Sequence, residues 1–136
     1  MPEKTVKYNF SSDPNGVHML LAKEVAPGSK VLDIGCASGY LGEFLTREKQ
    51  CEVWGVEPGI NSYKAALGKG YKFIVNQGIE SGLRDHFLLS EKFDYILLGD
   101  VLEHLINPEE ILRQIKEFLN ENGKILISLP NVAHYS

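Results

Sequence analysis

The sequence predicts an α/β domain in which an open, doubly wound parallel sheet is covered by helices on both faces. Two observations support this prediction. Short aliphatic runs alternate along the chain with stripes of apolar residues that repeat every three or four positions. The runs are predominantly apolar, as in strands that are buried on both faces. Right-handed crossovers then favour the strand order 3-2-1-4-5, with ligands outside the carboxyl ends of strands one and four.

The expected elements follow one another along the chain. The predicted strands comprise residues 31–34, 52–57, 72–75, 95–98 and 124–129. The predicted helices carry apolar stripes within residues 17–25, 41–45, 63–67 and 111–119. The last helix is the best marked, because Asn107 suits its N-cap, Pro108 its first position, Glu110 a capping box and Gly123 its end. We expect residues 1–14 to be irregular and residues 1–136 to form one domain.

Composition argues against several classes of function. The 136 residues are 43% apolar and 24% charged, which supports a core without disulfides or a metal. The 14 basic and 18 acidic side chains give a net charge of −4, so we expect no nucleic-acid partner. Apolar runs of about five residues, against the roughly 20 of a membrane span, predict no membrane partner. Cys36 and Cys51 lack metal-ligand spacing and no signal-like segment precedes them, which predicts free thiols and a cytoplasmic location.

A glycine-rich turn follows the first predicted strand, in the sequence VLDIGCASGYLG of residues 31–42. Gly35 and Gly39 allow a sharp turn and a close approach of a ligand to the backbone. Their G-x-x-x-G spacing differs from the G-x-G-x-x-G that cradles a pyrophosphate. Asp33, two residues before the turn, would repel phosphates and attract a cation such as the sulfonium or ammonium group of S-adenosylmethionine. The alternative is that Asp33 only caps or braces the loop.

The second predicted strand ends at Glu57, 22 positions after Gly35. A carboxylate at this place can accept hydrogen bonds from both hydroxyl groups of a ribose. This role does not separate S-adenosylmethionine from NAD. The alternative is a solvated glutamate at a strand end, although Pro58 and Gly59 favour a tight turn that would fix its direction.

Four segments together resemble successive motifs of the class I S-adenosylmethionine-dependent methyltransferases, in the branch that acts on small molecules: VLDIGCASGYLG, VWGVEP, FDYILLGDVLEHL and LISLPN. The match extends from Asn15 to Asn131 and implies a Rossmann-like sheet with S-adenosylmethionine as cofactor. By this resemblance, the methionine end of the cofactor would be held by Asp33, Gly35, Ala37 and Gly39, and Tyr40 would lie against it. Glu57 would hold the ribose. The adenine would be flanked by Gln77, Gly78 and Ile79. Cys36, Pro58 and Asp100 complete the expected cofactor-binding set.

The third loop departs from the family pattern. Residues 76–80, Asn-Gln-Gly-Ile-Glu, replace a frequent Gly-Asp pair whose aspartate receives the adenine amino group. Gln77 could supply a side-chain oxygen instead.

The segment after the fourth predicted strand holds the candidates for catalysis. The resemblance places residues 99–105 beneath the cofactor and beside the substrate, and Asp100 and His104 would lie one turn apart on a helix. A general base is needed only if the acceptor must lose a proton, and His104, Asp100 or His18 could then serve. A role for His104 in packing or hydrogen bonding alone is equally compatible with the sequence. A metal site from Asp100, Glu103 and His104 lacks further ligands, so no metal is predicted.

The acceptor class follows from what this segment lacks. Enzymes that methylate exocyclic nitrogens of nucleic-acid bases commonly carry Asn/Asp-Pro-Pro-aromatic here, and this chain does not. Together with the acidic balance, this predicts a small-molecule methyl acceptor. Two alternatives remain open: an NAD-binding oxidoreductase, which predicts glycine at position 37 and no carboxylate at position 33, and a non-catalytic cofactor-binding module that acts through a partner.

The chain stops at Ser136, just after the fifth predicted strand. Members of the family usually continue with two further strands, so the resemblance implies a sheet that lacks them and a chain truncated at its C-terminal end. Residues 124–129 would then form an apolar edge strand, a kind of edge that recruits another strand. We therefore expect self-association, either by pairing of these strands or by cover from residues 1–14 of the same or a neighbouring chain.

Overall fold

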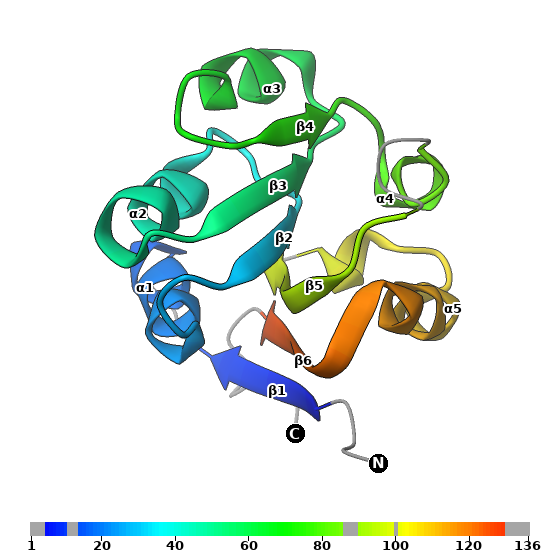
Figure 1. Ribbon diagram of the computed structural model, residues 1–136. Coiled ribbons are helices and arrows are strands. Elements are labelled where there is room, and N and C mark those ends of the chain that lie inside the picture. Colours follow the sequence, from blue (N-terminus) through cyan, green and yellow to red (C-terminus); the bar gives the residue numbers. More distant parts are fainter. Residues whose placement is uncertain (1–4, 11–13, 86–89, 100, 130–136) are drawn as a thin grey trace.

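The structure is a computed structural model that describes residues 5–10, 14–85, 90–99 and 101–129. Six strands of the described residues form one parallel sheet in the order β1-β6-β5-β2-β3-β4 (Figure 1). The strands are β1 (Thr5–Phe10), β2 (Lys30–Ile34), β3 (Glu52–Val56), β4 (Phe73–Val75), β5 (Phe93–Gly99) and β6 (Leu119–Leu129). The run β4-β3-β2-β5-β6 is the predicted order 3-2-1-4-5, which is thereby confirmed.

Helices cover both faces of this sheet (Figure 1). They are α1 (Pro14–Glu24), α2 (Tyr40–Lys49), α3 (Ile60–Ala66), α4 (Ile79–Gly82) and α5 (Pro108–Ile115), with the short 3-10 helices η1 (Leu102–His104) and η2 (Lys116–Phe118). The α1 and α2 helices pack on one face, where Leu21 and Leu45 meet Val31 of β2. The α4 and α5 helices pack on the other face, against the alternate β2 residues Leu32 and Ile34. This alternation decides which β2 side chains can face a ligand.

The strand β1 corrects two expectations. Residues 5–10, expected to be irregular, form a strand that pairs with β6 from Thr5 opposite Lys124 to Phe10 opposite Leu129. Val6, Tyr8 and Phe10 alternate with polar residues, which is the two-residue period of a strand. The expected free edge at residues 124–129 is therefore wrong, because the chain's own N-terminal segment covers it. This cover is one of the routes that the sequence had left open.

The last helix begins as predicted and ends earlier. The Asn107 side chain accepts a hydrogen bond from the Glu110 backbone N–H at 3.2 Å, so the N-cap is confirmed. The α5 helix ends at Ile115, and Gly123 lies inside β6 rather than at a helix end. The reason is an irregularity in β6, where pairing with β5 shifts register after Leu119. A Cβ at Gly123 would lie 2.9 Å from the Asn120 carbonyl oxygen, so glycine is needed there.

Cys36 and Cys51 are both free thiols. Among the described residues, the search for membrane-spanning segments finds no helix with the length and apolar character that a span requires.

Candidate functional site

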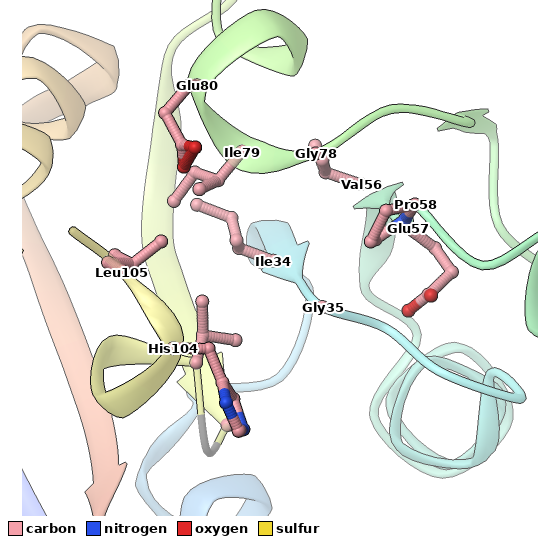
Figure 2. A pocket seen from close by; sticks show the side chains of 12 residues that line it. Ile34, Gly35, Val56, Glu57, Pro58, Gly78, Ile79, Glu80, His104 and Leu105 are labelled. Carbon is pink, nitrogen blue, oxygen red and sulfur yellow. The ribbon is translucent and has the colours of Figure 1, made fainter.

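A cavity of about 380 Å³ opens at the carboxyl ends of β2, β3 and β5. This is the place where the strand order reverses, and its volume lies within the roughly 300–1,000 Å³ of small-molecule sites. The described residues that line it are Ile34, Gly35, Val56, Glu57, Pro58, Gly78, Ile79, Glu80, Gly99, Val101, His104 and Leu105. Figure 2 shows Glu57, Glu80 and His104 on three different sides of this cavity.

The glycine-rich loop between β2 and α2 forms one wall. Gly35, Ala37 and Gly39 all have positive φ values, of 73°, 50° and 87°. A Cβ at Gly35 would lie 2.6 Å from Cγ2 of Val101, so only glycine lets the loop approach that side chain. Ala37 holds a left-handed conformation that is unusual for a residue with a side chain, which requires an external support.

Glu57 supplies this support. Its Oε1 accepts a hydrogen bond from the Ala37 backbone N–H, and its Oε2 accepts one from the Gly59 N–H, both at 2.8 Å. The side chain is 8% exposed, lines the cavity and points from the end of β3 toward the loop (Figure 2). Glu57 is therefore not a solvated strand end. Each carboxylate oxygen can accept a further hydrogen bond, so capacity for a ligand's hydroxyl groups remains.

The loop that follows β4 is hydrogen-bonded to the end of β3. The Asn76 side-chain amide donates to the carbonyl oxygens of Glu57 and Pro58, at 2.8 and 3.3 Å. Gly78 and Ile79 begin the α4 segment and line the cavity, as the sequence placed them. Gln77 is exposed and is not among the lining residues. Of the three residues predicted to flank the adenine, Gly78 and Ile79 therefore line the cavity and Gln77 does not.

Asp33 lies beneath the loop rather than at the cavity wall. Its side chain is 3% exposed, and its Oδ2 accepts a hydrogen bond from the Tyr71 hydroxyl at 2.6 Å. Burial raises the pKa of this carboxyl to about 6, the Tyr71 hydrogen bond lowers it, and the nearby charge of Glu57 raises it. The Asp33 carboxylate is thus tied to Tyr71 beneath the loop. Its charge still lies next to the loop.

The raised pKa gives a stability prediction for Asp33→Asn. The folded chain holds the Asp33 proton to higher pH than the unfolded chain does. Loss of this proton therefore disfavours the folded chain, and the free energy of unfolding falls as pH rises from 3.8 to about 6. Asparagine does not titrate. Relative to wild type, the variant should therefore gain up to about 3 kcal/mol between pH 4 and pH 7.5, at 1.36 kcal/mol per unit. Urea unfolding at several pH values measures this; a constant difference between the two proteins would contradict it.

Other predicted residues lie around the cavity without lining it. Cys36, a residue of the loop itself, is buried against Ala66 and Ile74, and burial raises the pKa of its thiol. Tyr40 begins α2, is 57% exposed and borders a separate depression beside Phe44. Neither side chain contacts the cavity.

The candidates for catalysis are only partly described. His104 ends η1 and lines the cavity. Asp100 lies outside the described residues, as do the side chains of His18 and Glu103. The described residues contain no group of three or more His, Cys, Asp or Glu that could hold a metal.

The charge of the lining restricts the ligand. Its described residues include two carboxylates, Glu57 and Glu80, and neither lysine nor arginine. Among these described residues, a phosphate would find no lysine or arginine, whereas a cationic ligand with hydroxyl groups would find acceptors. Sequence reasoning did not single out Glu80. It placed the segment 99–105 at the site, and the structure adds that Val101 and Leu105 are the residues of this segment that supply apolar lining.

Comparison with known proteins agrees with this geometry. The profile of a family described as a methyltransferase domain matches residues 12–136. Ubiquinone biosynthesis O-methyltransferases are among the similar curated proteins: that of Glaesserella parasuis is 34% identical over 113 residues, and that of Azorhizobium caulinodans 32% over 108. These alignments cover 76% of this chain but 46% and 41% of the relatives, so the chain spans less than half their length.

Solved structures share the fold. Coclaurine N-methyltransferase, bound to N-methylheliamine and S-adenosylhomocysteine, aligns with a TM-score of 0.68 at 23% identity, over 83% of this chain and 35% of that one. A TehB-like S-adenosylmethionine-dependent methyltransferase from Corynebacterium glutamicum aligns with a TM-score of 0.65 at 25% identity, over 82% of this chain and 60% of that one.

Proposed function

Because this chain belongs to the methyltransferase-domain family of class I S-adenosylmethionine-dependent enzymes, we propose that it binds S-adenosylmethionine in the cavity at the carboxyl ends of β2, β3 and β5. The methyl acceptor is a small molecule. The observation that carries the proposal is the lining of the cavity, which offers carboxylates and a glycine loop but no lysine or arginine among its described residues. S-adenosylmethionine carries a sulfonium and an ammonium group and no phosphate.

The residues present fit this cofactor. Glu57 would accept hydrogen bonds from the ribose hydroxyl groups with the lone pairs that Ala37 and Gly59 leave free. The backbone of Gly35 would lie against the methionine end, where no side chain intervenes. Ile79 and Leu105 provide apolar surface for the adenine, and Gly78 leaves open space because no atom lies within 4 Å of a Cβ placed there.

The chain's part in the reaction is chiefly alignment and exclusion of water. When bound, the cofactor supplies a methyl group that is already activated by its positive sulfur. A hydroxyl acceptor must lose a proton, and the relatives named above are O-methyltransferases. His104 lines the cavity and is the described candidate for taking that proton. Asp100 and His18 remain candidates from the sequence.

Location and assembly complete the proposal. A cytoplasmic location is supported by the two free cysteines, since unpaired thiols are typical of reducing compartments. The edge of β6 that self-association would need is occupied by β1 of the same chain.

Calorimetric titration of the chain with S-adenosylhomocysteine, NADH and ATP tests the cofactor. We expect S-adenosylhomocysteine to bind at least about a hundredfold more tightly than either phosphate-bearing ligand, since an unpaired buried charge costs several kcal/mol and every 1.4 kcal/mol is tenfold. Equal or tighter binding of NADH or ATP would overturn the assignment. The titration reads cofactor choice without requiring turnover.

A further inference from the structure

Tyr71 lies between α3 and β4, far in sequence from the glycine-rich loop, yet its ring lies directly beneath that loop. Two glycines make room for the ring. A Cβ at Gly42 would lie 2.0 Å from Cζ of Tyr71, and a Cβ at Gly55 would lie 3.1 Å from the ring. The α2 helix and β3 strand therefore form a slot that a side chain at Gly42 would close and a side chain at Gly55 would narrow.

The hydroxyl group of Tyr71 contacts both ends of the loop. It donates to Oδ2 of Asp33, near the end of the β2 strand that leads into the loop, at 2.6 Å. It also accepts a hydrogen bond from the Gly42 backbone N–H, in the first turn of α2, at 3.1 Å. One oxygen atom thus bridges the strand that leads into the loop and the helix that leaves it.

The bond to Gly42 replaces a missing cap. The N-cap of α2 is Gly39, which has no side chain to satisfy the free N–H groups of the first turn. The Tyr71 hydroxyl satisfies one of them from outside the helix. Glu57 supports the middle of the same loop through Ala37. The loop is therefore held at its two ends by one side chain and at its centre by another.

Resting on the cofactor site proposed above, we propose that Tyr71 is a positioning residue that sets the conformation of the Gly35–Gly39 loop and the direction of the Asp33 carboxylate for the cationic end of the cofactor. It acts through the loop and through Asp33. Nothing in this role requires contact with the cofactor itself.

The groups that face Asp33 decide what happens when the hydroxyl is removed. They are Tyr71, Glu57 and Cys36, and the Tyr71 hydroxyl is the donor among them. Without it, the carboxylate keeps the burial and the negative neighbour that disfavour its charge. Asp33 should then take up its proton at a higher pH, and the loop should lose the attraction of that charge for a cation.

The test is Tyr71→Phe, with Tyr95→Phe as the matched control. Tyr95 is also buried, and its hydroxyl also accepts from a backbone N–H, that of Ala26 at 3.2 Å, at a distance from the loop. Titration with S-adenosylhomocysteine from pH 5 to pH 8 should show about tenfold weaker binding for Tyr71→Phe at pH 7.5, the effect of one charge-assisted hydrogen bond. On acidification, Tyr71→Phe should lose its affinity for S-adenosylhomocysteine at a higher pH than wild type does. Tyr95→Phe should match wild type in both.

Amide hydrogen exchange supplies a second measurement that needs no ligand. Residues 35–42 should exchange faster in Tyr71→Phe than in wild type, while Tyr95→Phe leaves them unchanged. Asp33→Asn keeps an acceptor for the Tyr71 hydroxyl, so amide exchange in its loop should match that of wild type. Because asparagine does not titrate, the affinity of this variant for S-adenosylhomocysteine should no longer fall on acidification through the Asp33 pKa.

The outcomes separate this inference from the proposed function. If wild type fails to bind S-adenosylhomocysteine, the proposed function is overturned, while selective exchange at residues 35–42 still supports the role of Tyr71 in holding the loop. If wild type binds and Tyr71→Phe binds equally with the same pH midpoint, the inference is overturned. Equal weakening by Tyr71→Phe and Tyr95→Phe also overturns it, since that result means a general loss of stability.

Discussion

Replacing Glu57 with alanine is expected to weaken binding of S-adenosylhomocysteine by about a hundredfold, equivalent to about 2.7 kcal/mol. The substitution removes the acceptor for the Ala37 N–H, the acceptor for the Gly59 N–H and the proposed acceptor for the ribose. Hydrogen bonds to a charged group each contribute about 1.5–3 kcal/mol, and Ala37 loses the support for its positive φ. Calorimetric titration at pH 7.5 measures the loss.

Two companion variants define what this result means. Glu57→Gln keeps one acceptor oxygen and should lose less affinity than Glu57→Ala. Glu52→Ala removes a carboxylate at the opposite end of the same strand, where it contacts Trp54 and Lys72, and should leave the affinity unchanged. A dissociation constant that does not change in Glu57→Ala would show that the carboxylate plays no part in the site.

Phe93→Ala is expected to lower the free energy of unfolding by about 3–5 kcal/mol, the usual cost of removing a buried aromatic ring. Phe93 is fully buried at the start of β5, and its ring centroid lies 6.0 Å from that of Trp54 in an edge-on arrangement. Lys30 Nζ lies 5.4 Å from the same ring centroid. The ring belongs to a buried cluster that includes Trp54, Phe118 and Leu119, so its removal leaves a cavity inside the core. Urea denaturation at pH 7.5 measures the change.

The matched control is Phe73→Ala. Phe73 packs on Trp54 at 5.9 Å but is only half-buried, so its loss should cost clearly less. Because Phe93 lies at the amino end of β5 and the cavity at its carboxyl end, the folded fraction of Phe93→Ala should still bind S-adenosylhomocysteine. Equal destabilisation by the two variants would contradict the importance of full burial.

The parts of the fold that the sequence predicted well are those whose signal is local. Each central strand is a predominantly apolar run, and the start of α5 is marked within residues 107–110 by Asn107, Pro108 and Glu110. The positions of Gly35 and Glu57 at the cavity follow from the strand order, because the carboxyl ends of neighbouring parallel strands meet.

The features that were missed depend on contacts between distant residues. Nothing near Tyr71 in the sequence indicates that its hydroxyl reaches Asp33 and Gly42, since the slot for its ring is made by two glycines on other elements. The same holds for the hydrogen-bond partner of Asp33, which comes from a residue 38 positions further along the chain. The end of α5 was misplaced because Gly123 serves a strand irregularity, which has the same sequence signal as a helix end.

The pairing of β1 with β6 also sets an order of events in folding. Thr5 lies opposite Lys124, so the contact joins residues separated by nearly the whole length of the chain. Closing so long a loop costs entropy before the pairing adds stability, which slows this step relative to the local βαβ units. During synthesis, β1 must wait until β6 has been made before the two can pair. Among the described strands β1 is the one that covers this side of β6, so a partly folded chain that lacks the pairing would expose unpaired backbone groups to other chains.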